Sequence, residues 1–475
     1  MTTTVSELLA ALPDDERAER TLREDPRFRQ LYEDLARRPV PVGAMSRLWV
    51  LSGLHTQIAL AYTFHWIRGW FTGAEEQERR RLETHLAVAM KLLETMGYLR
   101  GAVLKAGQTL ANFRDLVPDE IVDTLSRLHF QAPPMHFSLF REQVHSELNG
   151  DPEEVFASFD TEPFAAASLG QVHRARLKTG EDVAVKIQYP GIARTIRSDL
   201  RNILTLMAPF RLTKDFENNK QQLQTLFEAL ELETDYEHEA RLTEAARALF
   251  TEDDGIVVPR VFPQFSTRRV LTLEFVEGMH ADQFLKSNPS QELRNRFAEK
   301  IMRAWYRLLF SGRLDYIDWH PGNFLFQADG QLGLIDFGCV RELTDAEWEW
   351  TRRADRLMQT HDRVELTAFV RDWCQIDDDP RHDEWLRMAT EYADLSWAAR
   401  IQDGPYDYSD PESLRRSAQL FGELTRKRYT RAQRVTSLFA RQEFAHRALF
   451  LRLGARIDIH PIRDEEVQAT GWDHA

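Results

Sequence analysis

Two short stretches, Asp-Trp-His-Pro-Gly-Asn at residues 318–323 and Leu-Ile-Asp-Phe-Gly at residues 334–338, decide the fold of this chain. Asn323 comes five residues after Asp318, and Asp336 comes thirteen residues after Asn323. Enzymes that transfer phosphoryl groups on the protein-kinase fold need an Asp near the attacking oxygen, and an Asn and a second Asp for magnesium. Each motif alone recurs by chance, but the ordered set is far more specific. The spacing therefore predicts a kinase-type active site.

Two elements that should precede this site are present in the right order. Residues 165–172 read Ala-Ala-Ala-Ser-Leu-Gly-Gln-Val, which fits the G-x-G-x-x-G-x-V phosphate loop except that alanine replaces the first two glycines. Sixteen residues after Gly170, a Val-Ala-Val-Lys run ends at Lys186, where a lysine would hold the α- and β-phosphates. Glu239 is the candidate carboxylate that fixes this lysine.

Alanine restricts the backbone more than glycine does, so we expect this loop to handle the γ-phosphate differently from a glycine-rich one. The residues predicted to contact the nucleotide are Ala165, Ala166, Ala167, Ser168, Gly170, Val172, Lys186, Glu274 and Val276.

Length and composition fit a folded enzyme. The 475 residues suffice for two or three domains, or for one two-lobed enzyme with helical extensions. A formal charge of −14 argues against a general nucleic-acid binder. The two cysteines, Cys339 and Cys374, cannot form a disulfide framework, which indicates folding in a reducing compartment.

The N-terminal region bears on localisation. The first 40 residues contain many acidic side chains and fit neither a secretory signal nor a transit peptide, so we expect a cytoplasmic protein. Residues 48–67 carry no Asp, Glu, Lys or Arg, and tryptophans lie near both ends. The run is long enough to span a bilayer, but His55, Gln57 and other polar residues interrupt it. The pattern favours a helix packed on the protein or lying on a membrane over a true span, with residues 48–71 as the peripheral contact.

Local patterns predict the order of the elements. We expect amphipathic helices over 75–112, a helix over 139–148 ended by Asn149-Gly150, strands at 183–187 and 270–275, and a helix carrying Leu223, Leu226, Phe227 and Leu230. After Gly278 the chain should be mainly helical, apart from short strands flanking Asn323 and Asp336, with a capping box at 344–347 and a break at 402–412. The predicted parts are an N-terminal helical segment (1–75), a helical extension (76–158), an N-lobe (159–277) and a C-lobe with a helical tail (278–475).

Five segments together resemble those of the UbiB atypical kinases, the protein-kinase-like family that supports ubiquinone (coenzyme Q) biosynthesis. The resemblance covers about half of the chain, from Leu99 to Arg341. Its segments are Lys-Ala-Gly-Gln (K-x-G-Q) at 105–108, the Ala-rich loop at 164–173, Glu-Thr-Asp at 233–235 followed by Glu239, and the two stretches at 318–323 and 334–338.

The resemblance implies an α+β, two-lobed protein-kinase-like fold with an N-terminal K-x-G-Q helical extension and a C-terminal helical tail. It implies ATP or ADP and Mg²⁺ as cofactors, held by Lys186 and by Asn323 and Asp336, with Asp318 in the catalytic loop and Lys186 paired to Glu239. In this family the extension replaces the peptide-binding site of protein kinases. The residues that it would bring together for regulation are Lys105, Gln108, Glu233 and Asp235.

The chain also departs from the family pattern. Trp319 stands where the family usually has Pro, and we expect it to change the shape of the substrate pocket without removing a ligand. No A-P-E segment follows Asp336, and the helix at Thr344 begins within six residues of Gly338, which leaves no room for an ordinary activation loop.

Simpler interpretations exist for single residues. Lys186 and Glu239 could form a purely structural ion pair, and Asp318 and Asn323 could be turn residues; only the joint pattern favours catalysis. No Cys/His cluster accompanies the histidines His173 and His320, so we expect them to shape loops through hydrogen bonds. Cys339 should be an inert, buried thiol.

Three functions remain open from the sequence. The first is a magnesium-dependent ATPase or small-molecule kinase that acts near a membrane on lipid or isoprenoid-quinone metabolism. The second is a nucleotide-binding pseudo-enzyme that regulates a partner protein complex. The third, a protein kinase, is disfavoured by the missing activation loop. The expected partners are a nucleotide and a membrane surface, lipid or isoprenoid molecule, with no nucleic acid.

Overall fold

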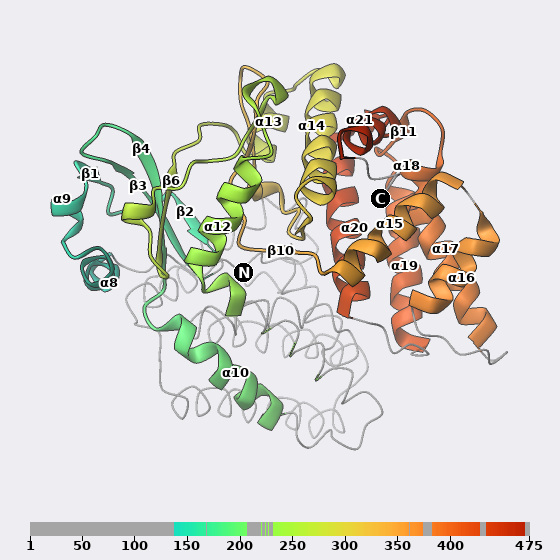
Figure 1. The fold of residues 1–475 in the computed structure, drawn as a ribbon, viewed down its shortest axis with the longest axis horizontal. Helices are drawn as coiled ribbons and strands as arrows, with labels where there is room; N and C mark the ends of the chain where they lie inside the picture. The colour runs from blue at the N-terminus through green and yellow to red at the C-terminus, as the bar shows by residue number, and fades with distance from the viewer. Residues whose placement is uncertain are drawn as a thin grey trace, which may run out of the picture. The chain divides into compact units, whose positions relative to one another are not determined.

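A computed structural model of the chain describes residues 137–167, 169–206, 231–360, 362–373, 382–427 and 434–470, together with residues 220, 224 and 227. These residues divide into two compact units (Figure 1). The first unit contains the described residues up to Tyr236 together with Phe262–Leu273, and the second contains Glu237–Val261 and the described residues from Glu274 onward.

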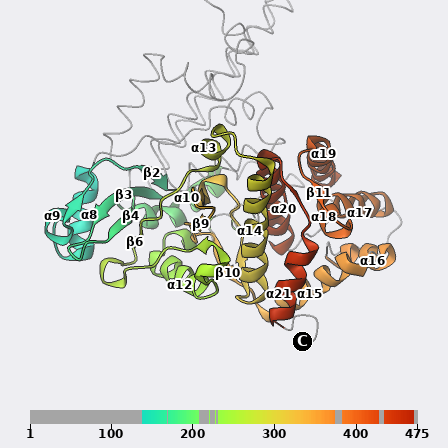
Figure 2. The ribbon, with the colours of Figure 1, turned by 90° about the horizontal axis from the view of Figure 1, so that it is seen from above.

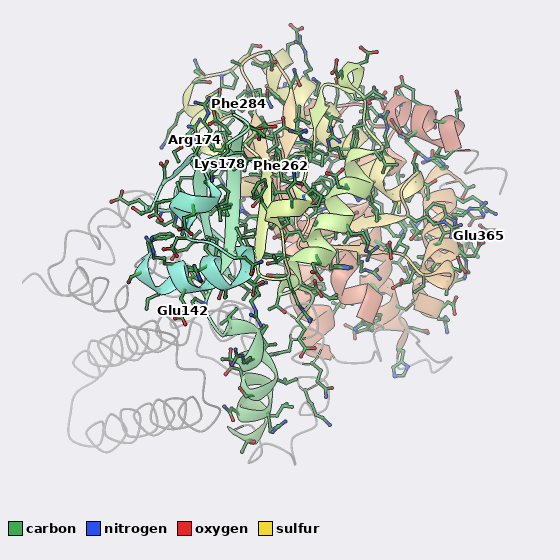
Figure 3. The ribbon with its side chains drawn as sticks, turned by 60° about the vertical axis from the view of Figure 1, so that its left-hand side comes forward. Glu142, Arg174, Lys178, Phe262, Phe284 and Glu365 are labelled. Atoms are coloured by element: carbon green, nitrogen blue, oxygen red, sulfur yellow. The ribbon has the colours of Figure 1, made fainter. Side chains whose placement is uncertain are left out.

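The first unit is built on a five-stranded sheet with the order β1-β3-β4-β6, in which β2 also pairs with β3. Its elements are α8 (Ser138–Leu148), α9 (Pro152–Val155), β1 (Ser158–Phe159), β2 (Ala165–Ala167), β3 (Gly170–Arg176), β4 (Asp182–Gln188), α10 (Ile192–Leu206), the 3₁₀ turn η3 (Pro263–Phe265) and β6 (Val270–Glu274). In β3, His173 and Ala175 are buried, whereas Arg174 between them lies on the other face (Figure 3). This alternation is the period of two that a strand imposes on its side chains.

One hydrophobic core stabilises this unit. Val183, Val185 and Ile187 of β4 are fully buried and belong to one cluster with Phe140 and Val144 of α8. Each side chain of this size contributes about 1.5–3 kcal/mol when it is removed from water. The packing of these side chains against α8 therefore fixes β4, the strand that carries Lys186.

The second unit contains two small sheets formed by strands on either side of residues 318–323 and 334–338, and a third sheet that includes a strand near the C-terminal end. The strands are β5 (Ile256–Val257), β7 (Leu314–Tyr316), β8 (Phe324–Phe326), β9 (Leu332–Leu334), β10 (Val340–Glu342), β11 (Tyr406–Asp407) and β12 (Arg456–Ile457). They form the sheets β5-β9-β8, β10-β7 and β11-β12.

Helices make up most of the second unit. They are α12 (Tyr236–Arg247), whose first residue belongs to the first unit, the 3₁₀ turns η2 (Glu252–Asp254) and η4 (Pro321–Asn323), and α13 (Ala281–Lys286), α14 (Gln291–Phe310), α15 (Asp345–Thr360), α16 (Arg363–Trp373), α17 (Asp383–Ser396), α18 (Ala398–Ile401), α19 (Pro411–Lys427), α20 (Arg434–Leu453) and α21 (His460–Thr470). Helix α14 packs against α21, and α17 packs against α19 (Figures 1 and 2). The ring of Phe284, labelled in Figure 3, stacks on Phe326 with the centroids 4.6 Å apart, which ties α13 to β8 in the core.

Several local sequence predictions are confirmed. Of the helix predicted to carry Leu223, Leu226, Phe227 and Leu230, only Phe227 lies among the described residues. Helix α8 ends at Leu148 with Asn149 in the left-handed conformation, and the strands at 183–187 and 270–275 are β4 and β6. Thr344 and Glu347 form the capping box, because Glu347 N donates to Thr344 Oγ1 at 3.3 Å and Thr344 N donates to Glu347 Oε2 at 3.0 Å. Among the described helices none is long and apolar enough to cross a membrane. The predicted elements within 1–136 lie outside the described residues.

Candidate active site

The loop after β7 holds Asp318 and Asn323 in a fixed relation. The side-chain amide Nδ2 of Asn323 donates to the carbonyl oxygen of Asp318 at 2.9 Å. His320 Nδ1 accepts a hydrogen bond from Gly322 N at 3.1 Å, which stabilises the turn at η4. Because the Asn323 amide donates through its nitrogen, its Oδ1 oxygen remains available as an acceptor or metal ligand.

A β-hairpin brings Asp336 to the same place. Strands β8 and β9 pair antiparallel with Phe324 opposite Leu334, and Ile335 N donates to Asn323 O at 3.1 Å. Asp336 follows directly, and its Oδ1 accepts a hydrogen bond from Gly338 N at 2.9 Å. The other carboxylate oxygen, Oδ2, does not take part in this hydrogen bond. The hairpin therefore places the three groups predicted from the sequence within one small region of the second unit.

Glu239 lies beside the same turn. A Cβ atom added to Gly338 would stand 3.2 Å from Asp336 Oδ1 and 3.3 Å from Glu239 Oε2, so both carboxylates flank Gly338. Glu239 is only 2% exposed and lies in the first turn of α12. A side chain at 338 would have to displace one of them, which gives a steric reason for glycine here.

Tyr316, which the sequence reasoning did not single out, ends β7 two residues before Asp318. Its ring is fully buried and meets Phe337 edge-on at 5.8 Å. Burial raises the pKa of the Tyr316 hydroxyl well above its usual range, and the carboxylates of Asp336 and Asp318 raise it further. The hydroxyl is therefore neutral at physiological pH.

This donor set fits a magnesium ion. Mg²⁺ is usually bound by one or two carboxylates plus substrate phosphates and water, and does not need an all-protein cage. Asp336 and Asn323 offer one carboxylate and one amide oxygen, with the Asp318 carboxylate close by. In the described part of the chain no group of three or more His, Cys, Asp or Glu residues could hold a metal by itself. The site accordingly suits a cation that arrives with a nucleotide.

Lys186 lies in the first unit, on β4, between the buried neighbours Val185 and Ile187. Its Nζ stands 5.3 Å from the ring centroid of Tyr236, a distance at which an ammonium group is attracted by an aromatic face. Its pairing with Glu239, a residue of the second unit, stays a prediction.

Residues 165–167 of the predicted phosphate loop form a strand and not the open loop that a glycine-rich sequence would favour. Ala165–Ala167 form strand β2, paired with β3 so that Ala165 lies opposite Val172 and Ala167 opposite Gly170. Alanine readily adopts the extended backbone conformation, whereas glycine has access to many more conformations. Backbone N–H groups that pair with β3 are not available to a phosphate. Ser168 lies outside the described residues.

Gly170 has a steric role in this hairpin. A Cβ atom added there would stand 2.1 Å from the carbonyl oxygen of Ile187 on β4. The close approach of the two strands therefore requires glycine at this position.

The other predicted site residues divide between the units. In the second unit the Glu274 carboxylate accepts a hydrogen bond from Arg260 N at 3.2 Å, and a Cβ atom at Gly333 would stand 3.0 Å from the Val276 side chain. In the first unit Asp235 forms an ion pair with Arg268 at 3.5 Å, and Glu233 is buried. Lys105 and Gln108 lie outside the described residues, so their contact with Glu233 and Asp235 stays a prediction.

Two expectations about individual residues are wrong. Trp319 does not shape a pocket, because its ring is 3% exposed and packs in the core against Phe324 and His446, with centroids 5.9 Å and 5.3 Å away. Cys339 is a free thiol but is only partly buried. The burial of Trp319 depends on a contact with His446, which is 127 positions away in the sequence.

The histidines do act through hydrogen bonds. His320 caps the η4 turn, as expected for a loop-shaping residue. His173 lies within a strand, where its Nδ1 is 2.8 Å from the carbonyl oxygen of Asp160 in the segment between β1 and β2. Burial lowers the pKa of His173, although the Asp160 carbonyl acts in the opposite direction.

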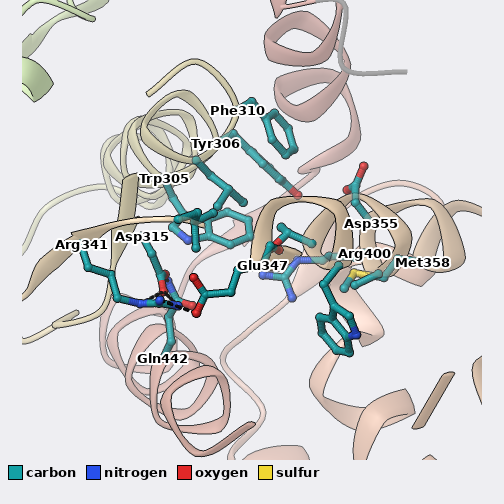
Figure 4. A pocket seen from close by; sticks show the side chains of 15 residues that line it. Trp305, Tyr306, Phe310, Asp315, Arg341, Glu347, Asp355, Met358, Arg400 and Gln442 are labelled. Atoms are coloured by element: carbon teal, nitrogen blue, oxygen red, sulfur yellow. Dashed lines mark hydrogen bonds and ion pairs between the residues drawn. The ribbon is translucent and has the colours of Figure 1, made fainter. Parts of the chain in front are cut away.

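Behind the β7–β10 pair lies a polar cluster that sequence reasoning missed (Figure 4). Arg341 Nε donates to Asp315 Oδ2 at 3.0 Å, and Arg341 NH1 donates to Glu347 Oε1 at 2.6 Å. Gln442 Nε2 donates to the carbonyl oxygen of Tyr316 at 2.8 Å. Burial raises the pKa of the Asp315 carboxyl, and Arg341 acts against that shift. Charged residues on short strands resemble surface positions in a sequence, so no local signal marks this cluster.

The cluster borders a cavity of about 40 Å³. Such a volume holds about three water molecules, so it is too small for a nucleotide. Its lining residues include Trp305, Tyr306, Arg400 and Asp355 (Figure 4). The hydrogen bonds of the cluster join β7 to β10, α15 and α20, just before the loop that holds Asp318.

The candidate site lies within the part of the chain that resembles known proteins. Residues 127–363 match the family model described as the ABC1 atypical kinase-like domain. The chain is 32% identical over 423 residues to "Atypical kinase COQ8B, mitochondrial" of Rattus norvegicus, covering 86% of this chain and 78% of that protein. It is 34% identical over 250 residues to "Atypical kinase COQ8, mitochondrial" of Saccharomyces cerevisiae, covering 52% of this chain and 49% of that protein.

A solved structure supports the fold. The chain aligns with a TM-score of 0.53 and 24% identity to the complex of Rv3197 with erythromycin from Mycobacterium tuberculosis, covering 83% of this chain and 98% of that one. At this identity the likeness shows the kinase-like fold alone. The family model and the relatives, in contrast, show that the chain belongs to the UbiB family of ABC1 atypical kinase-like proteins.

Proposed function

We propose that the chain is a magnesium-dependent, ATP-binding atypical kinase or ATPase. The observation that supports this most is the convergence of Asp318, Asn323 and Asp336, fixed by the bonds from Asn323 Nδ2 to Asp318 O at 2.9 Å and from Ile335 N to Asn323 O at 3.1 Å.

Each residue has a distinct role in this proposal. Asn323 and Asp336 would hold Mg²⁺, which when bound neutralises charge on the phosphates. Lys186 would bind the α- and β-phosphates, and Glu239 would fix that lysine. Asp318 would orient the acceptor hydroxyl or water and accept its proton. The remaining site residues of the first unit, on the β2–β3 hairpin, would cover the phosphates.

A lipid- or quinone-related role is part of the proposal. It rests on the family and on the names of the relatives, and the predicted membrane contact is residues 48–71. We propose a peripheral membrane protein of the cytoplasmic side, although the rat and yeast relatives carry the word mitochondrial in their names. Quinone and lipid extracts from cells with and without the gene would test it, since an unchanged profile would contradict the role.

Protein kinase activity has little structural support. From Gly338 to the start of α15 the chain consists of β10 and a short turn, and β10 pairs with β7 through Arg341 opposite Asp315. No segment remains there to hold a peptide substrate in the way an activation loop does.

ATP turnover by the full-length protein tests the proposal. We expect magnesium-dependent turnover that liposomes increase and that Asp336→Asn abolishes. Asp329→Asn is the matched control, because Asp329 lies on the exposed β8–β9 turn of the same unit and should leave turnover unchanged. Tight nucleotide binding with wild-type turnover no higher than that of Asp336→Asn would instead support a regulatory pseudo-enzyme, and phosphorylation of generic proteins would support a protein kinase.

A further inference from the structure

A side chain far away in the sequence holds the strand that leads to Asp318. Gln442 Nε2, on α20, donates to the carbonyl oxygen of Tyr316 at 2.8 Å and to Asp315 Oδ1 at 3.2 Å. Tyr316 ends β7, two residues before Asp318. Gln442 is only 5% exposed, and burial of an amide is costly unless the amide is hydrogen-bonded. These two bonds therefore both satisfy the buried amide and tie α20 to the end of β7.

The same face of α20 also contacts the residue after Asp318. His446 comes four positions after Gln442, so the two side chains lie on one face of the helix. The His446 ring packs on Trp319 with the centroids 5.3 Å apart, and its Nε2 lies 3.1 Å from Met302 Sδ of α14. One contact of α20 therefore precedes Asp318 in the sequence, and the other follows it.

We propose that Gln442 is a positioning residue, which fixes the backbone at Asp318 and through it the candidate metal ligand Asn323. The inference rests on the proposed function and adds a residue that supports its site. Asn323 Nδ2 donates to the carbonyl oxygen of Asp318 at 2.9 Å, so a displacement of Asp318 would also turn the Asn323 side chain. Gln442 lies beyond residue 363, where the match to the family model ends.

Gln442→Met tests the role of the amide, because methionine has a similar length but no N–H donor. Without the two bonds the end of β7 can shift, and small shifts of catalytic groups and of metal ligands reduce rate and affinity. We expect kcat for ATP turnover and the affinity for Mn²⁺ each to fall about tenfold. A merely structural glutamine predicts a lower melting temperature without either loss.

Arg447→Met is the matched control on the same helix. Arg447 is 7% exposed and also donates two hydrogen bonds, from NH1 to Ser417 Oγ at 2.7 Å and from NH2 to Ser413 Oγ at 2.8 Å, which tie α20 to α19. Its loss should lower the melting temperature at least as much as Gln442→Met does, but leave kcat and Mn²⁺ affinity at the wild-type values.

The measurements use the full-length proteins at a temperature well below their melting temperatures. Mn²⁺, a paramagnetic substitute for Mg²⁺, is titrated in the presence of ADP and followed by electron paramagnetic resonance. ATP turnover is measured with magnesium and liposomes, and the melting temperature is recorded for each variant.

The outcomes separate the two proposals. Gln442→Met with a lower melting temperature but wild-type kcat and Mn²⁺ affinity would overturn the positioning role and leave the proposed function standing. Equal losses of kcat and affinity in Gln442→Met and Arg447→Met would do the same, because they would show general destabilisation. Wild-type protein that binds Mn²⁺ with ADP but turns over no ATP would overturn the proposed function, while the Mn²⁺ affinity of Gln442→Met would still decide the positioning of Asn323. Wild-type protein that binds no Mn²⁺ would overturn both.

Discussion

In the first unit the candidate phosphate-binding residues lie on a hairpin that depends on close backbone contact. The second unit, which holds the candidate metal ligands, contains buried ion pairs. Arg400 and Glu443 of the second unit form a pair at 2.6 Å in which both side chains are 5% exposed. In the first unit Arg174 and Asp182 pair at 3.5 Å with 43% and 44% of their side chains exposed.

The difference has an energetic consequence. Exposed ion pairs contribute about 0–1 kcal/mol, while loss of one partner of a buried pair costs about 3–5 kcal/mol. Substitutions that create a steric clash should therefore cost the most stability in the first unit. Substitutions that remove one partner of a buried ion pair should cost the most in the second. Each of the following substitutions tests this difference between the two units.

The largest effect should come from Arg463→Met in the second unit. Arg463 Nε donates to Asp355 Oδ1 at 3.1 Å and Arg463 NH2 donates to Asp355 Oδ2 at 2.5 Å, with both side chains nearly buried. Methionine leaves the Asp355 charge uncompensated, so we expect a loss of about 3–5 kcal/mol in the free energy of unfolding, measured by denaturant titration.

Two controls accompany this substitution. Arg415→Met breaks an exposed pair with Glu412 and should cost under about 0.5 kcal/mol. The double variant Arg463→Met/Asp355→Leu should recover most of the loss, since no unpaired charge remains. A double variant as unstable as the single one would show that packing, and not charge, dominates here.

Gly170→Ala should have the next largest effect and act through sterics. The new Cβ would stand 2.1 Å from Ile187 O, so β3 and β4 would have to separate, at a cost of about 3 kcal/mol. Gly180→Ala is the control: its φ of +106° strains alanine, but no atom lies within 4 Å of the new Cβ. We expect a cost of about 1 kcal/mol there. Equal losses would mean that backbone strain alone explains both.

The candidate site and the capping box show what could be predicted from the sequence. The spacing of Asp318, Asn323 and Asp336 led to the correct strands and turns because short motifs encode local hydrogen bonds, such as the bond from Asn323 to Asp318. The capping box at Thr344 was predicted for the same reason.

Long-range features were not accessible in the same way. The Arg341–Asp315 pair joins residues 26 positions apart, and Gln442 reaches Tyr316 across 126 positions. No periodicity in one sequence reports such contacts. Trp319 was misjudged for this reason, since its burial depends on His446 of a distant helix.

A smaller effect should appear in the pH dependence of stability. Burial lowers the pKa of His446 well below its usual range, and Arg400 and Arg447 lower it further. The unfolded chain binds a proton near pH 6.5, but folded His446 stays neutral. Stability is therefore complete above about pH 6.5 and falls as the pH decreases below it, by at most about 1.4 kcal/mol per pH unit for one histidine.

His446→Gln should flatten this slope between about pH 6.5 and 5. Amide hydrogen exchange in α20 measures it in the second unit. His173→Gln should do the same for β3 in the first unit, because burial lowers that pKa as well. The exposed His280→Gln serves as the control. Unchanged slopes in both variants would contradict the assignment of buried, neutral histidines.

The smallest effect should come from His320→Ala, and it bears most directly on the contrast between the units. His320 Nδ1 accepts from Gly322 N at 3.1 Å and so holds the turn that presents Asn323. Alanine removes the acceptor, at a cost of about 1 kcal/mol, while His320→Asn retains one and should restore stability. If His320→Ala also weakens Mn²⁺ binding and His320→Asn recovers it, local backbone geometry positions the ligands of the second unit too. If Mn²⁺ affinity is unchanged in both variants, the buried charges and the β8–β9 hairpin suffice, and the contrast with the first unit holds.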